Sequence, residues 1–399
     1  MKRPLILIAY CALLAGLAFF ALRTPKLDTW DILAYAANAE ARHNNDFIHL
    51  HRYAYSQLQL HTPAANFINL TESSPYRRKT ASDPVLFGTV LQFYSIRPLY
   101  VMLLSLGTAL GVNPLLSAGL IAALSFFVDG LIAFLWMRAH TSEWIAFASS
   151  LLLMLSYPVS LVGRLDTPDA LAACAMFCAA YLIFERSRLL PGLVLLLAAV
   201  FIRTDTCVFA GFTLLFLTRA SNLRIRLRPA YALVLICLTA TSVLAIDHFA
   251  GNYGYASLMH NQFVNEADPP DARYSVSAAL YLRALASGVG APAVMHGYTF
   301  TFLLIGLLAF IRERTPMRDL GFIALLTALA HFALFPYFHD RLFAGEYLLF
   351  AIAAVCTLGV PITRAFRPGQ SDASGGDTRR LTLEISAARQ KLSGHPRRA

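Results

Sequence analysis

Charged side chains gather at the ends of the apolar stretches of this chain. The segment after the first apolar run reads RTPKLDTWDILAYAANAE and places Asp28 and Asp31 three residues apart, beside Trp30. If a helix begins here, both carboxylates lie on one of its faces, because residues one turn apart point the same way. A carboxylate in this position can act as a general base. We expect a functional role for Asp31 and favour a helix-capping role for Asp28, with a catalytic role as the alternative.

Three later turns repeat the combination of aspartate and arginine. Ionisable groups at a membrane edge are costly unless they are paired or used, so this recurrence predicts a polar site where the turns meet. The alternative is a set of separate ion pairs and helix caps, among them a cap by Asp169. The turns are GRLDTPD with Arg164, Asp166 and Asp169, RTD with Arg203 and Asp205, and HDR with His339, Asp340 and Arg341.

Arginines and carboxylates together suit one class of reaction. The planar fork of arginine binds phosphate through two parallel hydrogen bonds. A nearby carboxylate can take the proton of an attacking hydroxyl or amine, and the arginines stabilise the charge that develops on a departing phosphate. The combination predicts the transfer of a group from a lipid phosphate to an acceptor.

The composition places these turns in a membrane protein. Of the 399 residues, 57% are hydrophobic and 14% are charged, whereas a soluble domain has about 25% charged residues. Long apolar runs recur from end to end, which predicts an all-α, polytopic integral membrane protein with about ten transmembrane helices. We expect helices at 4–22, 114–137, 144–163, 169–185, 189–203, 206–218, 229–247, 294–311, 319–338 and 342–362.

The distribution of positive charge predicts the orientation. The short run 98–112 is taken to lie along the interface, and the predicted cytoplasmic segments then hold 20 of the 33 lysines and arginines. The loop RASNLRIRLRP, at 219–229, has four arginines and no acid, which places it inside by the positive-inside rule. Both termini are therefore expected in the cytoplasm, with two large outer loops at 23–97 and 248–293. This bias also explains the net charge of +10 without nucleic-acid binding.

One membrane domain, 1–362, and a basic, disordered cytoplasmic tail, 363–399, account for the chain. The first apolar run is interpreted as an uncleaved helix and not as a signal peptide, because no A-x-A site follows it. All six cysteines lie inside apolar runs, so disulfides and metal clusters are not indicated. Asp129 lies within a predicted helix, where it is either functional or bonded to a neighbouring helix.

The order of these motifs resembles a known family. The first helix is followed by D-x-x-x-Y-x-x-x-A, here Asp31, Tyr35 and Ala39, and a long polar segment ends in RPLY at 97–100. TPDAL at 167–171 comes next, and Arg341 precedes the last helix. This pattern is similar to the GT-C superfamily of polyprenyl-phosphate-sugar glycosyltransferases, which includes the protein O-mannosyltransferases and the lipid A aminoarabinose transferase. The resemblance covers roughly residues 1–220, with a weaker similarity near 335–360.

The resemblance implies a GT-C-like fold and a membrane glycosyltransferase. The enzyme would move a sugar from a polyprenyl phosphate to a lipid, glycan or protein acceptor on the outer face of a bacterial inner or plasma membrane. Many members carry an acidic pair where this chain has Asp31 and Ile32, so a divalent metal is left open and no other cofactor is implied. The competing hypotheses are a transporter or flippase of lipid-linked or anionic substrates, with Asp129 as a proton relay, and a scaffold without catalysis.

The resemblance also implies roles for individual residues. Asp31 would be the catalytic carboxylate, and Asp169 the second acidic position. Arg97, Arg203 and Arg341 would bind the lipid phosphate, although Arg203 is chosen more by its place than by its motif. Further candidates for substrate binding are Tyr35, Arg164, Asp166, Asp205 and Asp340.

Overall fold

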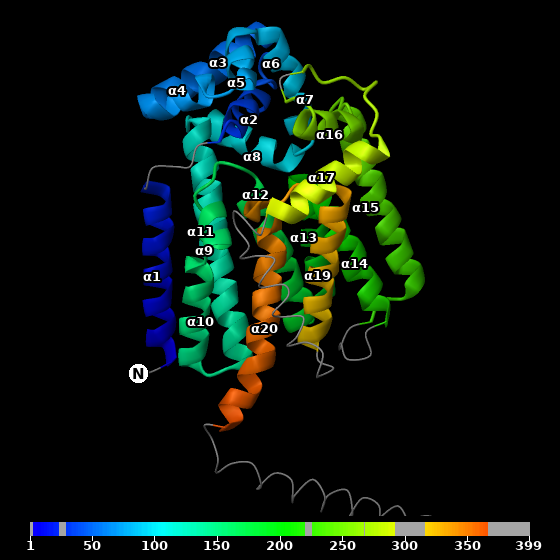
Figure 1. Cartoon of the computed structure of the whole chain (residues 1–399). Helices are drawn as coiled ribbons and strands as arrows, with labels where there is room; N and C mark the ends of the chain where they lie inside the picture. Colours follow the sequence, from blue (N-terminus) through cyan, green and yellow to red (C-terminus); the bar gives the residue numbers. More distant parts are fainter. Residues whose placement is uncertain (1–2, 24–28, 220–225, 267, 292–315, 366–399) are drawn as a thin grey trace, which may run out of the picture.

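The computed structural model describes residues 3–23, 29–219, 226–266, 268–291 and 316–365, and every regular element within them is a helix. Long helices stand side by side in a bundle, and shorter helices cover one end of it (Figure 1). We call these two parts the bundle and the cap layer. The bundle contains α1 (Arg3–Arg23), α9 (Pro114–His140), α10 (Glu143–Leu155), α11 (Tyr157–Val162), α12 (Asp169–Ala180), α13 (Leu189–Ile202), α14 (Cys207–Arg219), α15 (Pro229–Phe249), α19 (Pro316–Leu334) and α20 (Ala344–Ala365).

Within the described residues, four helices are long and apolar enough to cross a membrane, which supports the prediction of a helical membrane protein. They are Pro4–Arg23, Pro114–His140, Pro229–Phe249 and Met317–Leu334. About 20 apolar residues are needed for one crossing, and α10 and α13 are apolar but shorter than this. The number of spans therefore remains a prediction, and the helix expected at 294–311 lies outside the described residues.

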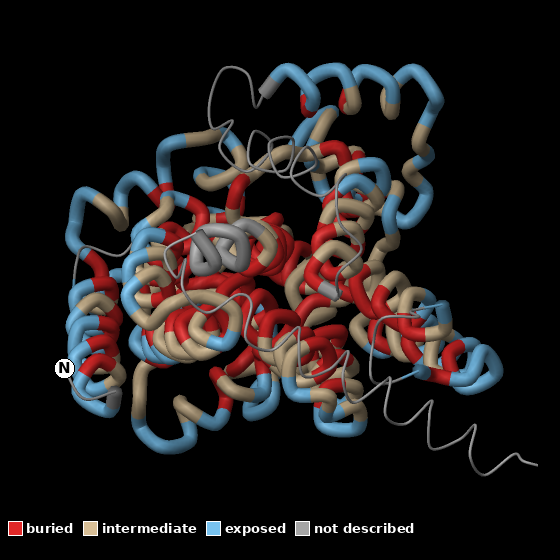
Figure 2. Tube along the Cα trace, turned by 90° about the horizontal axis from the view of Figure 1, so that it is seen from below, coloured by how far each residue is buried: buried red, intermediate tan, exposed pale blue. Residues whose placement is uncertain are grey.

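Two of the predicted bundle helices differ from the observed ones. The run 144–163 is split at Ser156, whose backbone is extended, and Pro158 lies in the first turn of the new helix, α11, where its missing N–H costs no helical hydrogen bond. The run 169–185 ends in a π-helical turn at Tyr181–Glu185. Most residues of α12 are buried, and buried residues predominate in the centre of the bundle (Figure 2).

The segment 23–97, expected as a polar loop, is folded into helices from residue 31 onward. Side chains cap these helices: Asp46 accepts from the His49 N–H, and Ser74 from the Arg77 N–H. Such caps satisfy backbone donors that the first turn leaves open. The cap layer comprises α2 (Asp31–Glu40), α3 (Phe47–His61), α4 (Ala64–Glu72), α5 (Pro75–Ser82), α6 (Pro84–Val90), α7 (Gln92–Ser95), α8 (Pro98–Ala109), α16 (Tyr255–Phe263) and α17 (Ala278–Ala291).

The short run 98–112 contributes α8 to the cap layer, across the end of the bundle (Figure 1). It follows Pro84–Ser95 after a bend of 114°. Helix α2 lies between α3, α8 and the end of α9, and its apolar side chains Ile32 and Leu33 are almost completely buried. The first residue of α2 is Asp31, so the packing of this helix holds that carboxylate at the boundary of the two parts.

Candidate functional site

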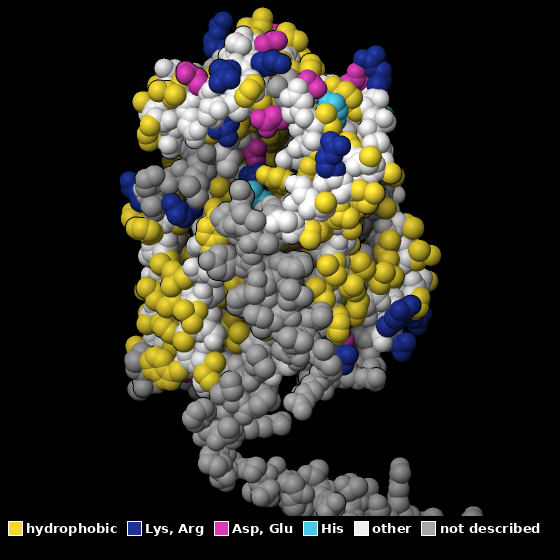
Figure 3. Space-filling model, viewed as in Figure 1, with side chains coloured by type: hydrophobic (Ala, Val, Ile, Leu, Met, Phe, Trp, Pro, Cys, Tyr) yellow, Lys and Arg dark blue, Asp and Glu magenta, His cyan; other side chains and the backbone are white. Residues whose placement is uncertain are grey.

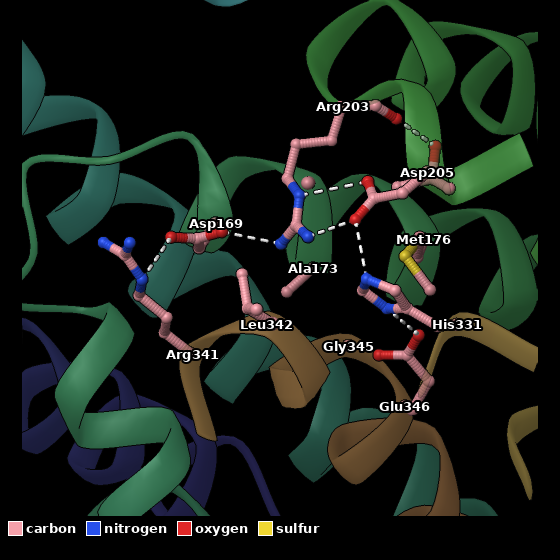
Figure 4. A pocket seen from close by; sticks show the side chains of 12 residues that line it. Asp169, Ala173, Met176, Arg203, Asp205, His331, Arg341, Leu342, Gly345 and Glu346 are labelled. Atoms are coloured by element: carbon pink, nitrogen blue, oxygen red, sulfur yellow. Dashed lines mark hydrogen bonds and ion pairs between the residues drawn. The ribbon is translucent and has the colours of Figure 1, made fainter. Parts of the chain in front are cut away.

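A continuous series of ion pairs lies where the cap layer meets the bundle. Acidic and basic side chains alternate along it, and they come from six different elements. Most of the series lines one pocket (Figure 4). In order, the ion-pair series consists of Asp31, Arg341, Asp169, Arg203, Asp205, His331 and Glu346.

Arg341 joins the two acids that the sequence singled out. Its Nη1 donates a hydrogen bond to Asp31 Oδ2 at 2.9 Å, and its Nε lies 3.9 Å from Asp169 Oδ2. Arg341 belongs to the 3-10 helix Asp340–Phe343 directly before α20. The structure thus brings the segment after the first apolar run into contact with the turn before α20.

Asp169 binds a second arginine on its other side. Arg203 Nη1 donates to Asp169 Oδ1 at 2.6 Å, and the hydroxyl of Thr167 donates to Asp169 Oδ2 at 2.6 Å. Asp169 is the first residue of α12, and the cap position before it is held by Pro168. The alternative interpretation of Asp169 as a cap is therefore wrong, and its carboxylate is instead shared by two arginines.

Arg203 is held from two directions. Its Nε donates to Asp205 Oδ1 at 3.1 Å and its Nη2 bonds to Asp205 Oδ2, an arrangement in which a guanidinium and a carboxylate lie fork to fork. The third contact is the one with Asp169. Although Arg203 is only 8% exposed, its charge is compensated by two carboxylates, as a buried ion requires.

His331 and Glu346 complete the series and were not among the predicted site residues. His331 Nε2 lies 3.1 Å from Asp205 Oδ2, and its Nδ1 lies 4.0 Å from Glu346 Oε1. Both residues are buried. The sequence did contain a signal, since each is a single ionisable residue inside an apolar run, in TALAHFALF and FAGEYLLF.

Asp31 has two further neighbours in the cap layer. The Tyr94 hydroxyl donates to Asp31 Oδ1 at 3.0 Å. Burial by itself raises the pKa of Asp31, but Arg341, Arg97 and the Tyr94 hydroxyl outweigh it and hold this pKa below its usual value. Asp31 is therefore ionised at neutral pH.

Arg97 and Tyr35 support this end of the site. The Arg97 guanidinium lies 5.6 Å from the ring centroids of both Tyr35 and Tyr94, within the range of cation–π attraction. Its Nη1 donates to the Phe93 carbonyl at 2.9 Å. Tyr35 is 1% exposed, so in this structure it packs beneath Arg97 and leaves little surface for a substrate.

Asp166 has a positional role in the structure. Its carboxylate accepts from the Thr29 N–H at 3.2 Å and from the Thr29 hydroxyl at 2.8 Å, and its carbonyl accepts from the Tyr100 hydroxyl at 3.0 Å. Because Thr29 precedes α2 by two residues, these bonds fix the start of that helix, and with it Asp31.

The other predicted residues that the structure describes do not line this pocket. Arg164 is half-buried and Asp340 is buried, and neither is among the described residues that line the pocket. Asp28 lies outside the described residues. Asp129 is buried in α9, beside Cys174 and Cys178 of α12, and it does not line the pocket either.

The pocket is small and polar at one wall. The space in it that is open to the centre of a water molecule is about 10 Å³, and its remaining walls are short or apolar. This is room for about one water molecule, so the ion pairs nearly fill the pocket and a phosphate enters only if their side chains move apart. Figure 3 shows charged and histidine side chains together in a hollow between the cap layer and the bundle. The other lining residues are Ala172, Ala173, Met176, Thr206, Leu342 and Gly345.

No metal centre is evident in the part of the chain that the structure describes. Within it, no group of three or more histidine, cysteine, aspartate or glutamate side chains is arranged to hold a metal ion. The acids of the ion-pair series are each bound to arginine or histidine. The ionisable side chains at the pocket are arginines, carboxylates and one imidazole.

Comparison of the chain with protein-family models, with curated proteins and with solved structures finds no match in any of the three. The likeness to the GT-C superfamily thus stays a hypothesis from short motifs. Any functional assignment has to be argued from the geometry of the ion-pair series.

Proposed function

We propose that this protein is a membrane glycosyltransferase that moves a sugar from a polyprenyl phosphate to an acceptor. The observation that carries the proposal is the pair Arg203 and Arg341, which share Asp169 at the pocket while Arg341 also holds Asp31. Two phosphate-binding groups thus stand next to one ionised carboxylate, as the reaction requires. The motif resemblance to GT-C enzymes supports the same conclusion.

Arg341 and Arg203 are suited to bind the phosphate of the donor. Both line the pocket, and both are oriented in advance by carboxylates, so little reorganisation is needed when charge develops. Arg341 Nε is buried and makes no hydrogen bond. A phosphate oxygen would satisfy this donor, because guanidinium N–H groups are matched to phosphate.

Asp31 is suited to accept the proton. The acceptor hydroxyl attacks the anomeric carbon, its proton passes to Asp31, and the carbon–oxygen bond to the phosphate breaks with its electron pair staying on the polyprenyl phosphate. A phosphate bound at Arg341 also partly neutralises the positive charge of that arginine. The ionised form of Asp31 is then stabilised less, so the pKa of the carboxylate rises and it becomes a better base. Inversion at the anomeric carbon is implied by the GT-C resemblance.

The position of the pocket fits a lipid-linked donor. A head group at the end of the bundle leaves its polyprenyl chain beside apolar helix surfaces, which form yellow patches on both flanks of the bundle in Figure 3. Helices α14 and α15 meet at the opposite end (Figure 1), and the segment 219–229 that joins them has four arginines and no acid. The positive-inside rule then favours an outer location for the cap layer and the pocket.

A transporter or flippase is the second candidate, and one observation favours it. Asp129 is buried in α9, which is long enough to cross a membrane, and carboxylates in such positions often relay protons. The ion-pair series, however, lies at one end of the bundle, and a transport path requires ionisable groups along its length. For this reason we favour the enzyme.

A transfer assay tests the proposal. The purified protein is given a panel of radiolabelled polyprenyl-phosphate sugars and cell extract as the source of acceptor, and release of polyprenyl phosphate is measured. We expect release from at least one donor, with loss of the activity in Arg203→Gln. Two results together contradict the enzyme and support the transporter. No donor releases polyprenyl phosphate, and vesicles that contain the protein take up a lipid-linked substrate only when Asp129 is intact.

A further inference from the structure

We infer that His331 and Glu346 are positioning residues that orient Arg203 toward the donor phosphate through Asp205. This inference rests on the proposed function and names two residues of the same site that the reaction itself does not use. His331 lies in α19 and Glu346 in α20, so the two helices together would fix the phosphate-binding arginine.

The placement of His331 is costly unless it serves the site. The residue is 8% exposed and lies in one of the four helices that can cross a membrane, where buried polar groups need partners. Its Nε2 lies 3.1 Å from Asp205 Oδ2. An ionised carboxylate only accepts hydrogen bonds, so this nitrogen carries the proton and the imidazole acts as a donor to Asp205.

The orientation of Arg203 depends on Asp205. Two of the three contacts of the guanidinium with the acids of the series are made to this one carboxylate. Asp205 lies in the short 3-10 turn Thr204–Thr206 between two helices, and His331 contacts the same carboxylate oxygen, Oδ2, that Arg203 Nη2 binds (Figure 4). Without the imidazole, the carboxylate of Asp205 is held by Arg203 alone, and the fork that aligns Arg203 loses its support from α19.

Glu346 acts on the imidazole from the opposite side. It is 4% exposed and lies 4.0 Å from His331 Nδ1. The neighbouring Gly345 allows this approach: a Cβ there would lie 3.2 Å from Met176 Sδ and 3.4 Å from the Ala173 Cα. Helix α20 can therefore pack closely on α12, and this packing places Glu346 at the pocket.

The inference makes a kinetic prediction that a purely structural role does not make. A misaligned Arg203 binds the donor phosphate less tightly, so the KM for the donor rises more than kcat falls. A histidine that only holds helices together would change the yield and thermal stability of the protein and leave KM unchanged in the molecules that fold.

The experiment compares His331→Gln, His331→Asn and His331→Leu in the full-length protein. Donor KM, kcat and the affinity for a long-chain polyprenyl phosphate in detergent are measured for each. A glutamine amide reaches the position of Nε2 and can donate to Asp205, whereas asparagine is too short and leucine has no donor. The matched control is His140→Leu, because His140 forms a comparable pair with Glu185 at 2.7 Å outside the pocket.

We expect His331→Leu and His331→Asn to weaken polyprenyl phosphate binding and raise the donor KM roughly tenfold or more, the effect of losing a hydrogen bond to a charged group. His331→Gln should stay within about threefold of the wild type, and His140→Leu should bind the lipid as the wild type does. If the leucine variant does not fold, the comparison of asparagine with glutamine decides.

Two results overturn the inference while the proposed function stands. In the first, His331→Leu and His331→Asn both keep the wild-type donor KM and lipid affinity. In the second, His331→Gln and His331→Asn lose lipid affinity to the same extent. A different result overturns the proposed function itself: a folded wild-type protein that neither binds polyprenyl phosphate nor releases it from any donor. The wild-type measurement therefore separates the two failures.

Discussion

Asp31 and Arg341 form an ion pair of 2.9 Å although 310 positions separate them in the chain. Asp31 begins a helix of the cap layer, and Arg341 lies in the turn that leads into α20. The pair thus joins the cap layer to the bundle, with Arg341 lining the pocket. In the proposed reaction it also joins the base to a group that binds the leaving phosphate.

Arg341→Gln is expected to lower kcat/KM by roughly 10²-fold or more, as the loss of a preorganised charge at the transition state does. Arg341→Lys should recover part of this activity, because it restores the charge but lacks the fork that reaches both Asp31 and Asp169. Steady-state kinetics with the preferred donor measure both. The control is Arg273→Gln, which removes an exposed arginine of the cap side; equal losses in Arg273→Gln and Arg341→Gln speak against a specific role for Arg341.

Asp169→Asn is expected to destabilise the protein, because it leaves Arg203 and Arg341 close together without their shared carboxylate. Removal of one partner of a buried ion pair costs about 3–5 kcal/mol, and the remaining amide oxygen lowers this cost. Thermal unfolding in detergent gives the change. Asp271→Asn, in an exposed pair with Arg273, should leave the melting temperature unchanged. A wild-type melting temperature in Asp169→Asn means that the carboxylate does not hold the arginines.

The acid side of the pH profile should report Asp31. Its pKa is lowered in the folded protein, so the carboxylate stays ionised as the pH falls and kcat/KM declines only below the usual carboxyl value of about 3.9. The stability that its ionised form contributes is present above the unfolded pKa and is lost as the pH passes through the folded one.

Tyr94→Phe tests this assignment. Loss of the hydroxyl bond to Asp31 should raise the pKa of the carboxylate and move the acid limb of kcat/KM to higher pH. The control is Tyr274→Phe, which removes a hydroxyl that donates to the Pro269 carbonyl. An acid limb that stays in place in Tyr94→Phe, or that moves to lower pH, assigns the limb to another group.

Thr29→Val should disturb the start of α2 without removing any charge. It deletes the hydroxyl that donates to Asp166, and we expect a loss of about 0.5–2 kcal/mol of stability, as for a helix-end hydrogen bond, together with a lower kcat. Thr29→Ser retains the hydroxyl and should resemble the wild type. Thermal unfolding and kcat are measured side by side, and a serine variant as impaired as the valine variant rules out this hydrogen bond as the cause.

The turns of the sequence predicted the centre of the site because the cost of an ionisable group depends on the residues next to it in the chain. Asp31, Asp169, Arg203 and Arg341 each stand at the end of an apolar run, where an ionisable group is costly, and the structure brings all four together. The same cost applies to ionisable residues inside the apolar runs, and it singles out His331 as well. The sequence analysis considered only Asp129 among such residues and therefore did not select His331.

Other features could not be obtained from patterns alone. Residues 23–97 have a polar composition, and their helices depend on individual caps such as Asp46 and on burial against α8 and α9. Asp166 shares its turn and its type with Asp169, but only the path of the chain decides that it binds Thr29 and not an arginine. Three-dimensional contacts between distant segments therefore separate the positioning acids from the candidate catalytic ones.

The most direct test of the proposed reaction is the release of polyprenyl phosphate by Asp31→Asn. Wild type, Asp31→Asn and Glu40→Gln are purified in detergent and given the donor panel with extract as acceptor; Glu40 ends the same helix and pairs with His49 at 3.0 Å. We predict that wild type and Glu40→Gln turn over, and that Asp31→Asn loses roughly 10²–10⁴-fold in rate, the usual contribution of a general base, while it still binds polyprenyl phosphate. Equal turnover by Asp31→Asn and wild type contradicts the account.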